Sequence, residues 1–337
     1  MNLPDIAMLP ILAEYFQVST DQLLGLKPLD GEEYIPQQTA TKEFWNKKLD
    51  YLLRSRRRYW NDDYVRFLVS QVWKIHEPVS LLDCGCGYGH LGLLLLPHLP
   101  EGSTYTGIDF AEELLREGKF LFAKQEMQAT FICKNVLEYT AENQYDFVIC
   151  QAVLRHLDDP ADFLRKMISF AKPGGYVACI DANREWEQCG LYIDGMDYWE
   201  LCRHEGYEKK WQMELKMQGR DYAVAIRAAH MMRKLGLREV DVRMNDRVDF
   251  VTPELTDYDE IKRDFIIYND WTSGIGEKER EKLILNLLNQ GLSHKEAEDL
   301  CNRNINIADF LAANPTAGYT FMKGFMISYG KKSCTSD

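Results

Sequence analysis

The run Leu81–Leu96, LLDCGCGYGHLGLLLL, constrains the fold of this chain more than any other stretch. An apolar segment containing Asp83 leads into the glycine-rich loop Gly85–Gly89, and a helical pattern follows from His90. A second apolar segment ends on Asp109, 20 residues beyond the last glycine of the loop. A strand, a glycine loop, a helix and a second strand ending in an acid together predict a site for a nucleotide-type cofactor.

Each part of this unit has a physical role. The glycines permit a tight turn and leave no Cβ between the backbone N–H groups and a ligand. The helix that opens near His90 offers unpaired N–H groups and the positive end of its dipole to an anionic group. Asp109, at the tip of the second strand, can accept hydrogen bonds from ribose hydroxyls.

Two residues distinguish between kinds of cofactor. A dinucleotide site has the pattern G-x-G-x-x-G, whose third glycine allows close packing of helix and strand. Here His90 holds that position, and the third glycine, Gly89, comes one residue early. The carboxylate of Asp83 is unfavourable beside a pyrophosphate but favourable beside a cationic ammonium or sulfonium. The pattern therefore favours S-adenosylmethionine (SAM) over a nicotinamide or a flavin.

The acid-x-G-x-G-x-G pattern of Asp83–Gly89 resembles motif I of the class I SAM-dependent methyltransferases. The resemblance is specific over about residues 58–181 and weaker to residue 330. Its further elements are ATFICKNVLEY (Ala129–Tyr139), NQYDFVICQAVLRHLDDP (Asn143–Pro160) and FAKPGGYVACID (Phe170–Asp181). It implies an α/β, Rossmann-like fold with a mostly parallel sheet and an antiparallel last strand.

The resemblance also implies which residues form the site. The residues expected to bind SAM are Asp83, Gly85, Cys86, Gly87, Asp109, Phe110, Asn135, Val136, Gln151 and Tyr59. Asn135 stands where the family usually has Asp, and its amide can both donate to and accept from the adenine edge. An N-terminal helix commonly closes over the cofactor in this family, so Tyr59 is a candidate cap; the alternative is a core aromatic residue.

His156 matches the second His of the family's frequent "HHL" pattern, with Arg155 in place of the first. It is a candidate general base for the acceptor, and the alternative is a structural histidine bonded to the next loop. The sequence predicts no metal site. Cys84 and Cys86 have C-x-C spacing, but they occupy variable positions of the glycine loop.

Composition limits the classes of partner and the compartment that we expect for this chain. The net charge of −12 argues against a sequence-independent grip on nucleic acid, which needs a basic face. Arg54–Arg58 could form a local basic patch, and its alternative is a solvated helix face. The sequence shows no charged-then-apolar leader and no run long enough to span a bilayer. Nine cysteines without a disulfide framework indicate a reducing cytoplasm.

Residues 1–26 resemble the last two helices of a Cro/CI-type helix-turn-helix domain, with Ser19 and Gln22 spaced as a capping box. The helices that would enter the major groove come earlier in such a domain. We therefore expect a remnant, or a packing or dimerisation arm, and no DNA binding; a homodimer is possible. The polar residues 27–40, with two prolines, predict a linker.

The remaining boundaries follow from changes in pattern. Residues 41–183 are expected to hold N-terminal helices and the SAM-binding core, residues 223–253 a core helix and strand, and residues 317–337 the last strand and tail. Residues 184–222, rich in Trp, Tyr and Met, and residues 254–316, largely helical, exceed the minimal fold and are expected to cap the active site. Predicted elements in this half are the helices Ala223–Leu235, Glu277–Asn289 and Ser293–Asn302 and the strands Arg238–Met244 and Tyr319–Tyr329.

These features predict a SAM-dependent methyltransferase for a small, partly apolar or aromatic molecule. Enzymes acting on exocyclic amines of nucleic acids carry an N/D-P-P-Y/F run after the fourth strand, where this chain reads QAVLRH. Cytosine-C5 enzymes need a Pro-Cys pair, which the chain lacks. Two alternatives stay open: a ligand-sensing transcriptional regulator built on the methyltransferase fold, and a methyltransferase for RNA or protein.

Overall fold

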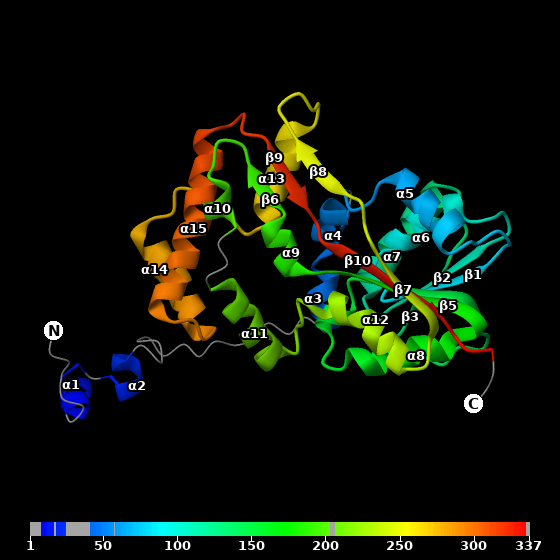
Figure 1. Cartoon of the computed structure of the whole chain (residues 1–337), viewed down its shortest axis with the longest axis horizontal. Helices are drawn as coiled ribbons and strands as arrows, with labels where there is room; N and C mark the ends of the chain where they lie inside the picture. Colours follow the sequence, from blue (N-terminus) through cyan, green and yellow to red (C-terminus); the bar gives the residue numbers. More distant parts are fainter. Residues whose placement is uncertain (1–7, 17, 25–40, 57, 203–205, 335–337) are drawn as a thin grey trace. The chain divides into compact units, whose positions relative to one another are not determined.

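A computed structural model describes residues 8–16, 18–24, 41–56, 58–202 and 206–334 of the chain (Figure 1). The predicted linker 27–40 lies outside these residues. The chain divides into two compact units. Unit 1 comprises Met1–Gln37, Tyr192–Gln218 and Val251–Tyr319, and unit 2 comprises Gln38–Leu191, Gly219–Phe250 and Thr320–Asp337.

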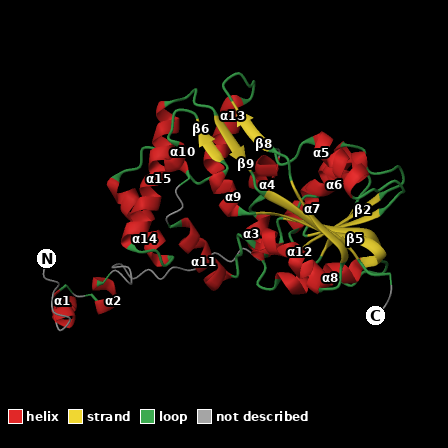
Figure 2. Cartoon of the chain, in the orientation of Figure 1, coloured by secondary structure: helices red, strands yellow, loops and turns green. Residues whose placement is uncertain are grey.

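Within the described residues, unit 2 contains a seven-stranded sheet with helices on both of its faces (Figure 2). Its strands are β1 (Ser80–Cys84), β2 (Thr104–Asp109), β3 (Thr130–Cys133), β4 (Tyr145–Gln151), β5 (Ala171–Ala182), β7 (Arg238–Met244) and β10 (Phe325–Lys331). They lie in the order β3-β2-β1-β4-β5-β10-β7. The pairs from β3 to β5 are parallel, and β10 is antiparallel to both β5 and β7. The predicted α/β fold with an antiparallel last strand is confirmed.

The helices of unit 2 flank this sheet. Those that the structure describes are α3 (Lys42–Asn46), α4 (Leu49–Arg56), α5 (Asp62–Phe67), η2 (Leu68–Val72), α6 (His90–Leu95), η3 (Leu96–His98), α7 (Glu112–Lys124), η4 (Leu154–His156), α8 (Pro160–Phe170), α9 (Arg184–Cys189) and α12 (Val224–Lys234). The helical pattern expected after residue 41 is thus present, divided into short pieces.

Alternate strand residues supply two hydrophobic cores, one on each face of the sheet. Leu81 and Ile149 pack with side chains of α5, η2, α6 and α7, whereas Leu82 and Val148 pack with side chains of α8 and α12. Successive side chains of a strand point to opposite faces. A parallel sheet covered by helices on both sides therefore has near-continuous apolar strands, which is why these strands are recognisable in the sequence.

The strand order reverses between β1 and β4, which lie side by side in the sheet. In open α/β sheets, ligands bind outside the carboxyl ends of the strands at such a reversal. The loop that follows β1 and the loop that follows β4 both lie at this edge.

The helices of unit 1 are mostly those of the two long segments beyond the minimal fold. The described ones are α1 (Leu9–Tyr15), α2 (Thr20–Leu23), α10 (Tyr198–Leu201), α11 (Tyr207–Gln218), α13 (Tyr258–Tyr268), α14 (Glu277–Asn289) and α15 (His294–Ala313). Helix α14 has the predicted bounds. Helix α15 begins directly after its predicted cap, Ser293, whose hydroxyl accepts a hydrogen bond from the Glu296 N–H. The helix ends at Ala313, beyond the predicted end at Asn302.

The two short helices predicted for residues 1–26 are present as α1 and α2. The predicted capping box is also confirmed: the Ser19 N–H donates to Gln22 Oε1 at 2.7 Å, and the Gln22 N–H donates to Ser19 Oγ at 3.2 Å. The resemblance of this segment to a helix-turn-helix tail stays a prediction.

The predicted strand Tyr319–Tyr329 is wrong in extent. Gly324, in the left-handed region at φ +62°, separates β9 (Tyr319–Met322) from β10, and only β10 joins the large sheet. β9 is the middle strand of a three-stranded sheet with β6 (Leu191–Ile193) and β8 (Val248–Val251). Among the described helices, none has the length and apolarity that crossing a membrane requires.

Candidate functional site

A cavity of about 380 Å³ opens at the carboxyl ends of β1 and β4, inside unit 2. Seven of the predicted cofactor residues line it: Gly85, Gly87, Asp109, Phe110, Asn135, Val136 and Gln151. The candidate base His156 lines it as well. The structure therefore brings together residues from the ends of β1, β2 and β4 and from the turn after β3.

The glycine loop is fastened to the end of β2. The backbone N–H groups of Gly85 and Cys86 both donate to the Ile108 carbonyl, at 2.8 and 3.0 Å. A Cβ on Gly85 would lie 2.7 Å from Val153 Cγ2, so this glycine allows the loops after β1 and β4 to approach each other. A Cβ on Gly87 (φ +56°) would project toward Leu114, which also lines the cavity. The missing side chain leaves this space for a ligand.

Asp109 is held in place by backbone donors. Its Oδ2 accepts from the Gly87 N–H and its Oδ1 from the Ala111 N–H, each at 2.8 Å. An ionised carboxylate has about four acceptor positions, so about two remain for the hydroxyls of a ligand. Burial raises the pKa of Asp109, and these same backbone hydrogen bonds oppose the rise.

Two amides in the cavity wall differ in how they are engaged. Gln151 is 3% exposed, and within the described part of the chain neither atom of its amide has a hydrogen-bond partner. A buried amide without a partner is costly unless a ligand or a water satisfies it. Asn135 Oδ1 accepts from the Leu137 N–H at 3.0 Å, which shapes the turn beside the expected adenine position.

The residue after Gln151 has a strained backbone. Ala152 lies in the left-handed region at φ +56°, which costs a non-glycine residue on the order of 1 kcal/mol. Its N–H donates to the Ile180 carbonyl at 2.8 Å, and this bond holds the conformation. Strain of this kind concentrates at functional sites because the surrounding structure must maintain it.

His156 is buried in a cationic environment. Burial, followed by the charges of Arg155 and Arg220, lowers the pKa of His156 well below its ordinary value, so the imidazole is neutral. Arg155 Nε donates to His156 Nε2 at 3.3 Å, and the Trp45 ring packs edge-on against the imidazole, with 5.1 Å between centroids. A neutral imidazole has one nitrogen lone pair, and here Arg155 engages it.

Three predicted residues lie outside the cavity wall. Asp83 is buried beneath the loop, where its Oδ2 accepts from the Tyr105 hydroxyl at 2.9 Å, and Cys86 is buried with its sulfur toward Gly107. Tyr59, the candidate cap over the cofactor, lies outside the wall as well. Tyr59 is 4% exposed and its ring lies 4.8 Å from that of Phe325 in β10, so it belongs to the hydrophobic core.

The N-terminal helices do line the cavity, but through other residues. Trp45 of α3 and Leu52 and Arg56 of α4 form part of the wall. The helical spacing of Trp45 and Leu52 marks them as inward-facing, but no local signal shows which cavity that face adjoins. Nowhere in the described ranges do three or more His, Cys, Asp or Glu side chains come together as a possible metal site.

The free energy of unfolding of the parent protein is expected to fall as the pH rises, and Asp83→Asn is expected to remove this fall. Burial raises the pKa of Asp83 from 3.8 to about 7, so between these values the folded state holds a proton that the unfolded state has released. The free energy of unfolding therefore falls as the pH rises from 3.8 to about 7 and stays low above that range. The fall is on the order of 2–4 kcal/mol. Urea unfolding at pH 5 and pH 8 measures this difference.

The Asn variant keeps an acceptor for Tyr105 and carries no charge, so it should lose less stability than the parent between pH 5 and pH 8. Asp50→Asn, at an exposed position of α4, is the matched control and should leave that difference in place. An unchanged pH dependence in Asp83→Asn would show that this carboxyl does not titrate in the window.

Comparisons with known proteins add sequence evidence. Residues 75–251, just over half of the chain, match the family model described as "Methyltransferase domain". A ubiquinone biosynthesis O-methyltransferase of Escherichia coli (strain SMS-3-5 / SECEC) is 26% identical over 183 residues, which cover 54% of this chain and 73% of that protein. Its counterpart in Escherichia fergusonii is 32% identical over 121 residues, or 35% of this chain and 49% of that protein.

Solved structures are similar at lower identity. A Haemonchus contortus phospholethanolamine N-methyltransferase 2, solved with phosphomonomethylethanolamine and S-adenosylhomocysteine, matches with a TM-score of 0.47 and 13% identity. The match covers 88% of this chain and 61% of that one.

Proposed function

Because the chain belongs to the methyltransferase domain family and is a SAM-dependent methyltransferase, we propose that it methylates a small, partly apolar or aromatic molecule. The observation that carries the proposal is the cavity at the strand ends, whose wall combines apolar side chains with the Asp109 carboxylate and the Gln151 amide. Sites for small molecules typically combine an apolar wall with a few placed polar groups. The similarity to ubiquinone biosynthesis O-methyltransferases supports a small-molecule acceptor over a macromolecule.

The residues of the cavity fit SAM. We assign the ribose hydroxyls of SAM to Asp109 and its adenine to Asn135 and Val136. The Gln151 amide, which has no partner in the described residues, can bond a polar group of SAM. Four carboxylates line the cavity, Asp109, Asp158, Asp159 and Asp162, against one guanidinium, that of Arg56. Their field favours a cationic ligand. SAM, when bound, supplies a methyl group on a positively charged sulfur that is a good leaving group.

The residues of the chain contribute mainly by placement. Holding the acceptor atom close to the methyl carbon and excluding water lowers the barrier by several kcal/mol. The prediction that His156 is a general base stays a prediction, and its surroundings favour another role. Arg155 Nε donates to His156 Nε2 at 3.3 Å, so the nitrogen that would have to accept a proton is already engaged.

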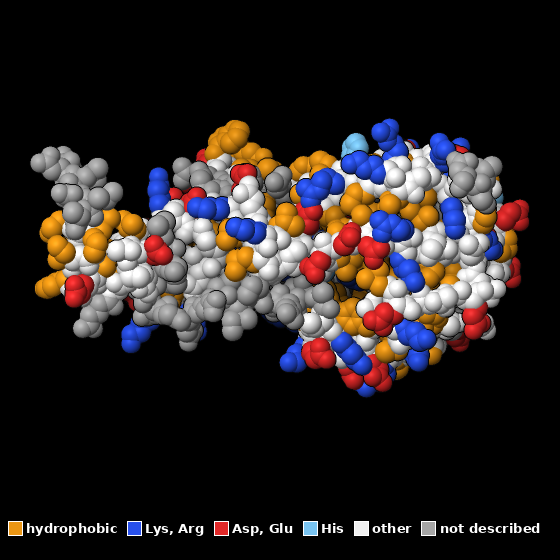
Figure 3. Space-filling view, turned by 90° about the horizontal axis from the view of Figure 1, so that it is seen from below, with side chains coloured by type: hydrophobic (Ala, Val, Ile, Leu, Met, Phe, Trp, Pro, Cys, Tyr) orange, Lys and Arg blue, Asp and Glu red, His pale blue; other side chains and the backbone are white. Residues whose placement is uncertain are grey.

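The face drawn in Figure 3 supports a small acceptor over a nucleic acid. On the face that Figure 3 shows, Lys and Arg side chains alternate with Asp and Glu side chains over the sheet-containing unit, without a continuous basic stripe. A nucleic-acid partner would need such a stripe. The nine cysteines, all within the described residues, form no disulfide, which supports a cytoplasmic location. The involvement of residues 184–222 and 254–316 in acceptor binding stays a prediction.

Incubating the protein with methyl-labelled SAM and a metabolite extract tests the proposed function. We expect the label in a low-molecular-weight product that mass spectrometry can identify. Parallel incubations with total RNA and with a protein extract should remain unlabelled. Label in either macromolecular fraction, or no measurable binding of SAM or S-adenosylhomocysteine by calorimetry, would refute the proposal.

A further inference from the structure

Strand β7 forms one edge of the seven-stranded sheet of unit 2. Its inner side pairs with β10, and within the described residues no other strand pairs with its outer side. Val240 and Val242 are half-buried, and the other residues of the strand are exposed. An exposed edge strand presents N–H and C=O groups to which a further strand can bond.

The backbone groups of β7 alternate between its two sides. The Asn245 N–H, directly after the strand, donates to the carbonyl of the first residue of β10 at 2.9 Å, so Asn245 faces β10. Because the facing side alternates along an antiparallel ladder, Val242 and Met244 face outward. Two contacts agree with this direction. The Met244 carbonyl accepts from the Tyr64 hydroxyl, and the Val242 N–H donates to the Asp241 carboxylate at 2.8 Å.

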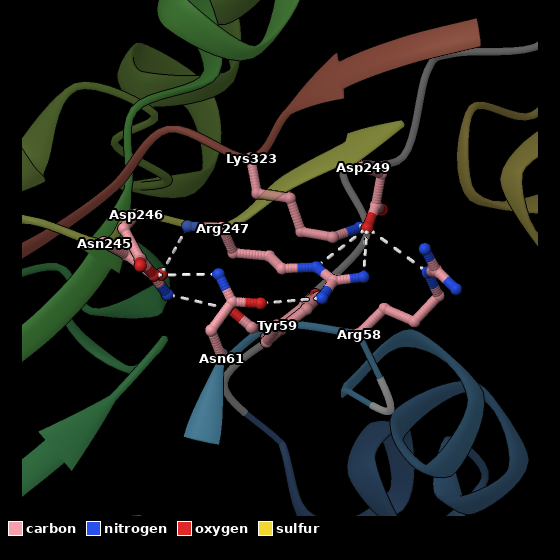
Figure 4. A network of polar contacts seen from close by, with 8 residues as sticks. All are labelled: Arg58, Tyr59, Asn61, Asn245, Asp246, Arg247, Asp249 and Lys323. Carbon is pink, nitrogen blue, oxygen red and sulfur yellow. Dashed lines mark hydrogen bonds and ion pairs between the residues drawn. The ribbon is translucent and has the colours of Figure 1, made fainter. Parts of the chain in front are cut away.

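The stretch of β7 that is available for pairing is short. At its start, the register between β7 and β10 shifts, and Glu239 lies in the left-handed region at φ +50°. At its end, Asn245 Nδ2 donates to the Tyr59 carbonyl at 2.8 Å, which ties the chain after the strand to the segment before α5 (Figure 4). Val240–Met244, with the sequence VDVRM, lies between these two limits.

This stretch is complementary to itself in one register. When two copies pair antiparallel about a two-fold axis, outward-facing residues must lie opposite each other, so the axis can pass through Asp241, Val242 or Arg243. An axis through Asp241 or Arg243 places two like charges directly opposite each other, which destabilises a strand pair. An axis through Val242 places Asp241 of each copy opposite Arg243 of the other. It also places the apolar side chains of Val240 and Met244 opposite each other.

The side chains at this edge are accessible to a second copy. Asp241 and Arg243 are both exposed, and their charged groups lie 3.5 Å apart within one chain. Exposed apolar side chains lie at the same edge: Met244 is 38% exposed, and Phe67 of α5 is 46% exposed. The Phe67 ring stacks on that of Tyr64, with 5.9 Å between centroids, and Tyr64 bonds Met244. Burial of this apolar surface would add to the strand pairing.

We propose that two copies of this chain associate through their β7 strands, antiparallel and with the two-fold axis at Val242, so that their sheets join into one. The N–H of each Val242 then bonds the carbonyl of Val242 in the other copy, and the Asp241 carboxylate turns to Arg243 of that copy. The inference does not depend on the methyl acceptor, because in the described part of the chain no β7 residue lines the cofactor cavity.

Two charge-reversal variants test the association and its register. Asp241→Arg and Arg243→Asp each bring like charges opposite each other in a pair of identical copies, so each should raise the Kd of the dimer at least about 10-fold. An equimolar mixture of the two variants restores opposite charges across the pair and should associate like the parent. Sedimentation velocity over a range of protein concentrations measures the average mass of each sample. The mixture separates pairing between copies from the ion pair within one chain, which both variants lack.

Val242→Pro removes an N–H that faces away from β10, so it should abolish association and leave the sheet intact. Lys119→Asp, at an exposed position of α7, changes the net charge as much as Arg243→Asp and should associate like the parent. Urea unfolding of every variant checks that the fold is retained.

Three results would overturn the proposal. The parent protein could stay monomeric at about 100 µM, a concentration that detects even a weak dimer, and the edge would then be left to a strand of another protein. The two charge-reversal variants could associate like the parent, or their mixture could stay monomeric. Any of these results would show that two β7 strands do not pair about Val242.

Discussion

Replacing Asp109 by alanine is expected to raise the Kd for SAM and for S-adenosylhomocysteine by about 100-fold or more. The variant loses the carboxylate to which we assign the two ribose hydroxyls, and two hydrogen bonds to a charged group are worth about 3 kcal/mol at the lower end. It also leaves the Gly87 and Ala111 N–H groups without the carboxylate that orients them. Isothermal titration of the full-length protein with S-adenosylhomocysteine measures the change.

Glu112→Ala is the matched control for the Asp109 variant. Glu112 begins α7, three residues further along the chain, and its side chain is 72% exposed beside Lys42. This variant should bind S-adenosylhomocysteine like the parent. A Kd within about threefold of the parent value in Asp109→Ala would mean that the ribose does not bind at this carboxylate.

Replacing Gly89 by alanine is expected to lower the free energy of unfolding by about 2–4 kcal/mol. Gly89 precedes α6 in the left-handed region at φ +80°, which costs an alanine about 1 kcal/mol. Its Cβ would also lie 2.9 Å from Phe122 and 3.0 Å from Phe131, inside a packed aromatic cluster. Overpacking of a core typically costs a further 1–3 kcal/mol, at about the scale of one methyl group.

Gly236→Ala separates these two causes. Gly236 follows α12 at φ +90°, and apart from its chain neighbours no atom of the described residues lies within 4 Å of the position of its Cβ. This variant should therefore lose only the conformational part, about 1 kcal/mol. Urea unfolding of both variants gives the comparison. Equal losses would show that the aromatic cluster moves aside and that Gly89 is not needed for close packing.

The parts of the site that could be predicted are those that neighbours in sequence define. Gly85, Gly87 and Asp109 belong to one strand–loop–helix–strand unit, whose turn and strand signals are local, and all three line the cavity. Gln151 was found because it ends an apolar strand. The division of Tyr319–Tyr329 was missed, because the left-handed turn at Gly324 interrupts a pattern that otherwise alternates like a single strand.

The covering of the cavity could not be predicted in the same way. Tyr59 and Trp45 both belong to helical, aromatic-rich sequence, and either could face the cofactor. The choice depends on how the segment packs: Tyr59 packs on Phe325 of β10, and Trp45 packs on His156. Contacts between residues so far apart in the chain leave no periodic signal in either partner.

The sequence by itself determined the cofactor class and the parallel core, because glycine conformation, strand alternation and helix period act over a few residues. Only the tertiary structure decided how distant residues combine. Arg58 and Asp249 are 191 residues apart, yet their side chains meet, and Arg247 and Lys323 contact the same buried carboxylate. These side chains meet because the packing of the whole sheet brings their segments together. That packing depends on many contacts between distant residues, so no local sequence pattern predicts it.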